Sequence, residues 1–463
     1  MSTSRFIVDP SWRRPARGKT VFAGSPIKLF SLSDEGKTIV EAIEHGQMLP
    51  DGHDSLTTRL LDAGAIHPLV MPDDECPFNA LDVTVVIPAL VRNEDDCRLL
   101  QQLVESCSFM AAVIVVDDYS PVLLPQLSAA QVVRTDFAGG PGLARNIGLQ
   151  LVATPLVAFI DLDVSITQET VNEMLAYFNA QRVGLVAPRV CSKPGADIIA
   201  QYETARSPLD LGEVEARIRS GTRVSYVPSA MWLCRTSALH EIHGFDASLN
   251  VGEDVDAVWR LDKAGWQCRY QPNASCTHEP RKSLQGLISQ RISYGKSAAT
   301  LAKKHRGALA PVRVSGFSAV IWTLIAAGFP GISAIVGFGT VVALARKLRT
   351  TPDAPREALR LAGLGNLHAG RSLASAITRV WWPIAVLLAL VSRRARVVLL
   401  AAAVIPSMYE WWKKRPSIDP LRYTALRALD DGAYGVGVWK GVLREKSADA
   451  LMPDLTSWPK SAR

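Results

Sequence analysis

Short apolar runs alternate with amphipathic stretches from Val83 to about Gln271, and this alternation dominates the middle of the chain. The apolar runs are residues 83–90, 111–120, 131–137, 155–164 and 183–190. Strands that are apolar at nearly every position are buried on both faces, as in a parallel sheet covered by helices. The helices between them are predicted over residues 93–107, 142–153 and 167–181. We therefore expect a mostly parallel, doubly wound α/β sheet with helices on both faces, spanning a domain of residues 79–310.

Residues 1–78 show a different pattern and are predicted to form a small separate domain, with a linker at 71–80. The predicted elements are two strands, 19–24 and 27–32, and two amphipathic helices, 33–46 and 55–70. Ser33 is the predicted N-cap of the first helix. In the next domain, Ser165 followed by Gln168 predicts a capping box for the helix near 167.

The C-terminal third is rich in long apolar runs. Residues 314–345 contain no charge and are interrupted by Pro330 and Gly331, and shorter apolar runs follow at 380–392 and 397–412. Spanning a bilayer takes about 20 apolar residues. A single span, a re-entrant hairpin, helices lying in the membrane plane with Trp anchors, and a helical cap without a membrane all remain open. We predict a membrane-associated helical region over 311–416 and a C-terminal helix and tail over 417–463.

Composition and charge narrow the class of protein. Of the 463 residues, 48% are apolar, which excludes wholesale disorder. The net charge of +7 lies largely beside the C-terminal apolar runs, which favours anionic lipid over nucleic acid as a partner. Basic residues flank every run, so the positive-inside tendency places all ends on the cytoplasmic face of the membrane. The 7 cysteines form no C-x-x-C pair, and the N-terminus lacks the apolar core of a secretory signal.

Polar residues stand where the predicted strands end, and they are the candidate chemistry of the chain. Two aspartates, Asp117 and Asp118, lie at the strand end within the run 111–120, and two more, Asp161 and Asp163, lie at the strand end within the run 155–164. Residues i and i+2 of a strand point the same way, so Asp161 and Asp163 are expected to converge on one point beyond the sheet. A divalent cation carrying phosphate fits there, and oxygen ligands favour Mg²⁺ or Mn²⁺ over Zn²⁺.

The order of these motifs resembles that of family 2 glycosyltransferases, which have the nucleotide-sugar-binding GT-A fold. The resemblance covers about residues 81–300 and is carried by "VTVVIPA", "VVDDYS", "GGPGLARNIG", "FIDLDV", "GFDASLNVGED" and "RLDKAG". It implies an inverting transferase that uses a metal ion. Val91 stands where relatives often have Asn, and the Q-x-x-R-W motif of processive relatives is absent.

The resemblance also implies roles for individual residues. Donor-binding residues would be Pro88, Asp117, Asp118, Arg145 and Asp161. Metal ligands would be Asp163, Asp161 and His278. The catalytic base would be Asp254, with Glu253 beside it. Acceptor residues would be Trp232, as a stacking platform, and Arg291, in the stretch nearest to the missing processive motif.

The whole chain is most similar to one subgroup, the glycosyltransferases of mycofactocin systems. Its first 78 residues resemble the winged-helix domains that bind peptides in peptide-modifying pathways, and "LDDGAYGVGVWKGVLRE" near the C-terminus extends the match. The subgroup implies a UDP-sugar donor, glucose as the hexose, and a peptide-derived acceptor that receives a short β-linked oligosaccharide. Two alternatives stay open: a membrane glycosyltransferase that acts on a lipid-linked or cell-surface glycan, and a non-catalytic peptide-binding scaffold.

Overall fold

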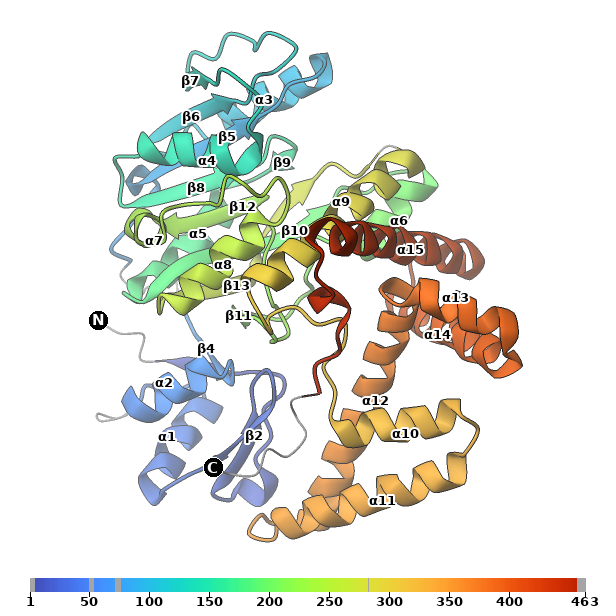
Figure 1. Ribbon diagram of the computed structural model, residues 1–463. Coiled ribbons are helices and arrows are strands. Elements are labelled where there is room, and N and C mark those ends of the chain that lie inside the picture. The colour runs from blue at the N-terminus through green and yellow to red at the C-terminus, as the bar shows by residue number, and fades with distance from the viewer. Residues whose placement is uncertain (1–4, 50–53, 71–75, 282, 456–463) are drawn as a thin grey trace. The chain divides into compact units, whose positions relative to one another are not determined.

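The apolar runs that begin at Val83 form the first strands of one large mixed sheet, which also includes three later strands that those runs did not predict (Figure 1). The computed structural model describes residues 5–49, 54–70, 76–281 and 283–455, so residues 71–75 of the predicted linker lie outside the described part. The chain divides into a first unit, residues 1–195 and 206–280, and a second unit, residues 196–205 and 281–463.

The strand order of the large sheet is β11-β13-β10-β12-β8-β5-β6-β7, and β9 pairs with β13. The strands are β5 (Val83–Ala89), β6 (Ala112–Asp117), β7 (Gln131–Arg134), β8 (Leu156–Ile160), β9 (Val164–Ser165), β10 (Val183–Ser192), β11 (Ala216–Ile218), β12 (Met231–Arg235) and β13 (Gln267–His278). The half formed by β8, β5, β6 and β7 is parallel, as predicted. In the other half β10 and β13 are also parallel, but β12 runs antiparallel to both β8 and β10, and β9 and β11 run antiparallel to β13. The sheet is therefore mixed, and the prediction of a mostly parallel sheet was wrong for these antiparallel strands.

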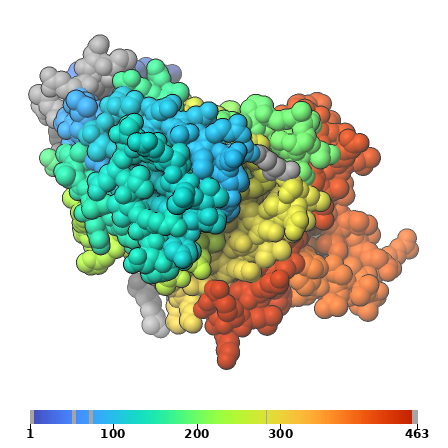
Figure 2. All heavy atoms as spheres, turned by 90° about the horizontal axis from the view of Figure 1, so that it is seen from above, coloured from blue at the N-terminus to red at the C-terminus, as the bar shows by residue number. Residues whose placement is uncertain are grey.

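Helices cover both faces of the parallel half. The helices of the first unit's larger part are α3 (Glu94–Ser106), α4 (Gly140–Gln150), α5 (Gln168–Leu175), α7 (Thr236–Glu241) and α8 (Glu253–Lys263). Leu100 and Leu103 of α3 share a core cluster with Val85, whereas Gly148 of α4 lies directly against Val86. Successive strand residues point to opposite faces, so α3 and α4 lie on opposite sides of β5. In the space-filling view, the residues of this half, coloured blue to teal, form one closely packed mass (Figure 2).

The N-terminal part of the first unit has its own small core. Its elements are β1 (Phe6–Val8), β2 (Thr20–Ala23), β3 (Lys28–Ser31), α1 (Asp34–Glu44), α2 (Asp54–Asp62) and β4 (Ile66–Pro68). Strands β2 and β3 pair as an antiparallel hairpin, and β1 pairs with β4. The Ser33 side chain accepts a hydrogen bond from Gly36 N, which confirms it as the N-cap of α1.

The second unit is helical in its described residues. Its helices are α6 (Ile198–Arg206), α9 (Leu284–Lys304), α10 (Gly316–Ala326), α11 (Pro330–Lys347), α12 (Ala354–Arg379), α13 (Trp382–Val391), α14 (Arg393–Lys414) and α15 (Pro420–Glu445). The uncharged run 314–345 is divided between α10 and α11, and Pro330 begins α11, a position where its missing N–H is not needed.

None of the helices that the structure describes is by itself both long and apolar enough to cross a bilayer. One pair, α12 with α13, is long and apolar enough only when its two helices, which are bent at 86° to each other, are taken together.

Candidate active site

Asp117 and Asp118 lie at the carboxyl end of β6, where the parallel strands end. Asp117 is buried, and its two carboxylate oxygens accept hydrogen bonds from Ser120 N at 2.9 Å and from the Arg134 guanidinium at 2.5 Å. Arg134, the last residue of β7, also lies 5.4 Å from the ring of Tyr119. We did not single out Arg134 from the sequence, although an arginine closing the neighbouring parallel strand was the available signal.

Asp118 holds the glycine-rich turn that begins α4. Its carboxylate accepts hydrogen bonds from the backbone N–H groups of Gly139 at 2.7 Å and Gly140 at 2.9 Å. Gly140 has a φ of +81°, a left-handed conformation that glycine adopts without steric cost. Two of the N–H groups at this helix start, which have no partner within the helix, are thus bound by a carboxylate.

Arg145 of α4 is the central cation of the site. It is buried, and it donates to Glu253 Oε1 at 2.8 Å and to Asp161 Oδ1 at 2.6 Å. Burial works against its charge, but Asp161 and Glu253 outweigh that effect and raise the pKa of the Arg145 guanidinium. The Phe245 ring lies 5.5 Å from the guanidinium carbon. Arg145 therefore joins the end of β8 to the start of α8, which are far apart in the sequence.

Asp254 stands next to Glu253 in the first turn of α8, after Gly252, whose φ is +89°. Its Oδ1 accepts from Val255 N at 2.8 Å and its Oδ2 accepts from Ser229 N at 3.3 Å. Loss of hydration and the neighbouring charge of Glu253 raise the pKa of Asp254 to about 7, and the two N–H donors and Arg145 counteract only part of this. A carboxylate with a pKa near neutrality can take up a proton during a reaction. Nothing in the sequence pointed to Ser229.

The geometry at Asp161 and Asp163 differs from the predicted alternation. Strand β8 ends at Ile160, and Asp163 lies in the turn between β8 and β9. The prediction that both carboxylates extend from one strand was wrong, since the chain turns after the first. Asp161 N bonds to Ala230 O at 2.9 Å, and Glu279 N bonds to Asp163 O at 3.2 Å.

His278, the last residue of β13, pairs with Val164 of β9 and is therefore close to Asp163 along the sheet edge. Its Nε2 lies 3.3 Å from Ser192 Oγ. Over the described ranges, no three His, Cys, Asp or Glu side chains form a group able to hold a metal ion. The oxygen donors of Asp161 and Asp163 still fit Mg²⁺ or Mn²⁺, because such ions are often held by one or two carboxylates together with substrate phosphates.

The remaining predicted site residues, Pro88, Trp232 and Arg291, lie in three different structural environments. Pro88 lies in β5, one residue before Ala89, which pairs with Asp117. Trp232 is fully buried, stacks on Phe245 and donates its indole N–H to Pro228 O at 2.8 Å. In this structure its ring has no open face, so its position gives no support to the predicted stacking on an acceptor.

Arg291 lies on α9 of the second unit and is also buried. It pairs with Asp430 of α15 at 2.9 Å and with Glu203 of α6 at 3.1 Å. Asp430 also accepts a hydrogen bond from the Tyr202 hydroxyl. These bonds hold three helices of the second unit together, which is a structural role, and the predicted acceptor contact remains a prediction.

Known proteins resemble this chain in its middle part and, in one case, over almost its whole length. Residues 82–293 match the family model described as "Glycosyltransferase like family 2". Pre-mycofactocin glycosyltransferase of Mycobacterium tuberculosis is 37% identical over 466 residues, which covers 97% of each chain. Succinoglycan biosynthesis protein ExoA of Rhizobium meliloti is 28% identical over 126 residues, which is 25% of this chain and 38% of that protein.

Among solved structures, the mannosyltransferase PcManGT from Pyrobaculum calidifontis in complex with GDP-Man and Mn²⁺ aligns with a TM-score of 0.42 and 13% identity. That alignment covers 80% of this chain and 91% of the other. The family match spans the strands and helices that carry the site, and the M. tuberculosis relative matches almost from end to end. The chain belongs to the family 2 glycosyltransferases, is most like those of the pre-mycofactocin type, and is an enzyme that transfers sugar.

Proposed function

We propose that this enzyme transfers a hexose, glucose, from a UDP-sugar to pre-mycofactocin, and builds a short β-linked oligosaccharide on that peptide-derived acceptor. The acceptor is proposed because the M. tuberculosis relative carries that name and matches 97% of the chain. The observation that carries the chemistry is the position of Arg145, which bonds to Asp161 and to the Glu253 beside Asp254. One buried cation thus connects a donor-side carboxylate to Glu253, the residue next to the candidate base.

In the proposed reaction, Asp254 accepts the proton of an acceptor hydroxyl. The hydroxyl oxygen forms its bond to C1 of the sugar from one face, while the bond from C1 to the UDP phosphate oxygen breaks on the other. One such displacement inverts the anomeric centre, so an α-linked donor gives a β-linked product. General base catalysis contributes roughly 10²–10⁴-fold. A divalent cation at Asp161 and Asp163 would stabilise the charge on the leaving diphosphate.

The test is a donor and acceptor panel with the full-length protein. UDP release is measured with Mn²⁺ or Mg²⁺, with UDP-glucose, other UDP-sugars and GDP-mannose, and with or without pre-mycofactocin. We expect UDP-glucose turnover that depends on the acceptor and the metal, with hexose mass increments on the product. Transfer from GDP-mannose alone, or undiminished turnover in EDTA, would contradict the donor or the metal assignment. Asp254→Asn should bind UDP normally and transfer no sugar.

We also propose that the N-terminal part, residues 1–78, binds the peptide portion of the acceptor. The support is its resemblance to winged-helix peptide-binding domains and its own hydrophobic core. Peptides add to such domains mainly as an extra strand at a sheet edge. A fluorescently labelled precursor peptide should bind the full chain with a rise in anisotropy that does not require UDP-glucose. A peptide that binds only in the presence of the donor would argue for recognition at the transfer site instead.

The second unit is proposed to lie on the cytoplasmic face of an anionic membrane, with its helices in the membrane plane. Its described helices expose many large apolar side chains, among them Ile335, Phe338, Leu387, Leu390 and Val391, each more than 60% exposed. Exposed apolar surface of this extent favours a membrane or protein partner. Basic residues near the helix ends suit anionic headgroups. These basic residues are Arg313, Arg346, Lys347, Arg393, Arg394, Arg396, Lys413 and Lys414.

A further inference from the structure

The segment between β11 and β12 connects the N-terminal part of the first unit to the candidate base, Asp254. It begins at Arg219, next to the N-terminal part, and reaches Ser229, which donates its backbone N–H to Asp254. We call residues 219–229 the supporting segment. Its first half is a tight turn: Arg219 N bonds to Val224 O at 3.1 Å, and the Thr222 hydroxyl donates to Arg219 O and to Val224 O. The turn is therefore expected to move as one body.

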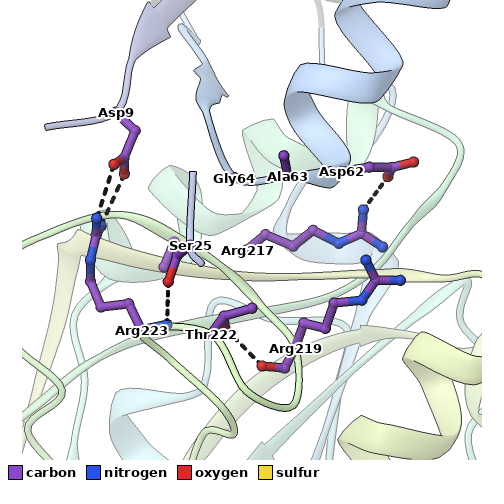
Figure 3. Close-up of a pocket in the computed structure, with 10 residues that line it drawn as sticks. Asp9, Ser25, Asp62, Ala63, Gly64, Arg217, Arg219, Thr222 and Arg223 are labelled. Carbon is purple, nitrogen blue, oxygen red and sulfur yellow. Dashed lines mark hydrogen bonds and ion pairs between the residues drawn. The ribbon is translucent and has the colours of Figure 1, made fainter. Parts of the chain in front are cut away.

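Arg223 attaches this turn to the N-terminal part (Figure 3). Its guanidinium donates one hydrogen bond to each oxygen of Asp9, both at 2.9 Å, and its backbone N donates to Ser25 Oγ at 2.6 Å. Asp9 is only 1% exposed and also contacts His67 at 3.0 Å. Burial opposes ionisation of Asp9, but hydrogen bonds from His67 and Arg223 outweigh it and hold its pKa well below the usual range. A paired, bidentate guanidinium–carboxylate contact fixes orientation as well as position.

Other arginines of the same pocket hold the surrounding elements (Figure 3). Arg217 pairs with Asp62 of α2 and, at 3.1 Å, with Asp262 of α8. Arg219 pairs with Asp262 at 3.0 Å and is 41% exposed. Each arginine of the pocket thus pairs with an aspartate of the protein.

Buried tryptophans hold the second half of the supporting segment. The Trp259 indole N–H donates to Ser225 O at 2.7 Å, and the Trp232 indole N–H donates to Pro228 O at 2.8 Å. Both rings are almost fully buried. A shift of the turn at Arg223 must therefore strain these bonds or displace Ser225, only four residues before Ser229.

We propose that Arg223 is a positioning residue for sugar transfer: its pairing with Asp9 fixes the supporting segment and so keeps the Ser229 N–H on the carboxylate of Asp254. This rests on the proposed role of Asp254 as the base. The other charged groups around Asp254 are Glu253 beside it and Arg145 of α4, which in turn pairs with Asp161. Of the groups named as acting on the Asp254 carboxylate, the Ser229 N–H is the one that comes from the supporting segment.

The test compares variants of the full-length protein, using UDP-glucose, Mn²⁺ and pre-mycofactocin for kinetics. Misplacing a catalytic group by about 1 Å can cost 10²-fold, so Arg223→Ala should lower kcat by roughly 10- to 100-fold. The KM for UDP-glucose should stay unchanged, because the donor-binding residues are untouched. In a protein labelled with ¹⁵N-tryptophan, the indole signal of Trp259, assigned with Trp259→Phe, should shift in Arg223→Ala.

Matched variants separate positioning from a general loss of folding. Asp9→Asn should reproduce the loss from the other side of the contact, and combining it with Arg223→Ala should cost no more than either change alone. Ser25→Ala removes an uncharged hydrogen-bond partner of Arg223. It should lower kcat by less than Arg223→Ala does and should shift the Trp259 indole signal in the same direction. Arg98→Ala removes an exposed pair with Asp95 on α3, outside the supporting segment, and its kcat should stay within about twofold because exposed pairs contribute little.

Three results would overturn the proposal: an unchanged Trp259 signal in Arg223→Ala, a fully active Asp9→Asn, or an equal loss of kcat in Arg98→Ala. If Asp254→Asn still transfers sugar, the assignment of the base fails separately. In that case the indole signal still decides whether Arg223 holds the supporting segment, since it is measured without turnover.

Discussion

Asp254 is held between influences that act on its carboxyl group in opposite directions. Loss of hydration and the charge of Glu253 favour the protonated form, whereas Arg145 and the N–H groups of Val255 and Ser229 favour the ionised form. The balance leaves its pKa at about 7, well above the ordinary value for an aspartate. A base with this pKa is ionised in only part of the enzyme population at neutral pH.

The first prediction concerns the pH dependence of transfer. The base must be ionised to accept a proton, so kcat/KM should rise with pH and level off above a midpoint near 7. An ordinary aspartate base would give a midpoint near 4. The measurement is a pH profile of kcat/KM with the donor concentration varied. A flat profile between pH 5 and 8 would contradict the raised pKa.

The second prediction concerns Glu253→Gln, which removes one of the two causes that raise the pKa of Asp254. The variant removes a negative charge beside Asp254 and leaves Arg145 less neutralised, and both changes lower the pKa of Asp254. The midpoint of the pH profile should therefore move to lower pH. A midpoint that stays near 7 would show that loss of hydration alone sets the pKa.

The third prediction concerns Arg145, which pairs with two carboxylates, those of Asp161 and Glu253. Arg145→Ala leaves Glu253, which is only 6% exposed on its side chain, as a charge without its cation. Breaking a buried ion pair from one side costs about 3–5 kcal/mol of unfolding free energy. Urea denaturation measures this. The control is Arg98→Ala, which removes the exposed pair with Asp95 and should cost no more than about 1 kcal/mol.

At the scale of elements, the predictions were correct where the contact that fixes the end of a helix lies within a few residues in the sequence. Ser33 caps α1 as its position predicts. The predicted capping box at Ser165 was wrong, because Ser165 belongs to β9 and Thr167 caps α5 instead. The direction of β12 could not be predicted either: an apolar run shows that a strand is buried but contains no information on which way it runs. The same holds for Trp232, whose burial depends on Phe245 and Pro228.

The fourth prediction concerns the crossing of α9 and α15, where glycines allow the two backbones to touch. A Cβ on Gly295 would lie 2.1 Å from Tyr434 O and 2.8 Å from Val438 N, so Gly295→Ala forces the helices apart. Overpacking of this kind costs about 1–3 kcal/mol or more, and the thermal midpoint followed by circular dichroism should fall. In Gly432→Ala, on α15, the added Cβ meets nothing within 4 Å. That control should be neutral or slightly stabilising, because alanine favours a helix by roughly 1 kcal/mol over glycine.

At the scale of the whole molecule, the site is assembled from residues that are distant in sequence. The order of the motifs, through its resemblance to family 2 glycosyltransferases, was enough to predict that Asp117, Arg145, Asp161 and Asp254 belong to one functional region. The common edge of the parallel strands accounts only for Asp117 and Asp161. Bonds between them, such as those of Arg145 to Asp161 and Glu253, could not be predicted, since they depend on how α4 and α8 lie against the sheet. Arg134 and Ser229 enter the site only through such three-dimensional contacts.

The last prediction tests the proposed attachment of the second unit to a membrane. Leu390 and Val391 at the end of α13 are 71% and 85% exposed, so replacing both by aspartate should leave the fold intact. Placing two carboxylates on a lipid-facing surface removes apolar burial and adds repulsion from anionic headgroups. In flotation with vesicles containing phosphatidylglycerol, the wild type should float with the vesicles and the double variant should stay with the soluble fraction. The matched control is Leu123→Asp in the first unit, where the side chain is 84% exposed, and this variant should float like the wild type. If high salt alone releases the wild type, only the basic residues hold it, and the exposed apolar helices then have another partner.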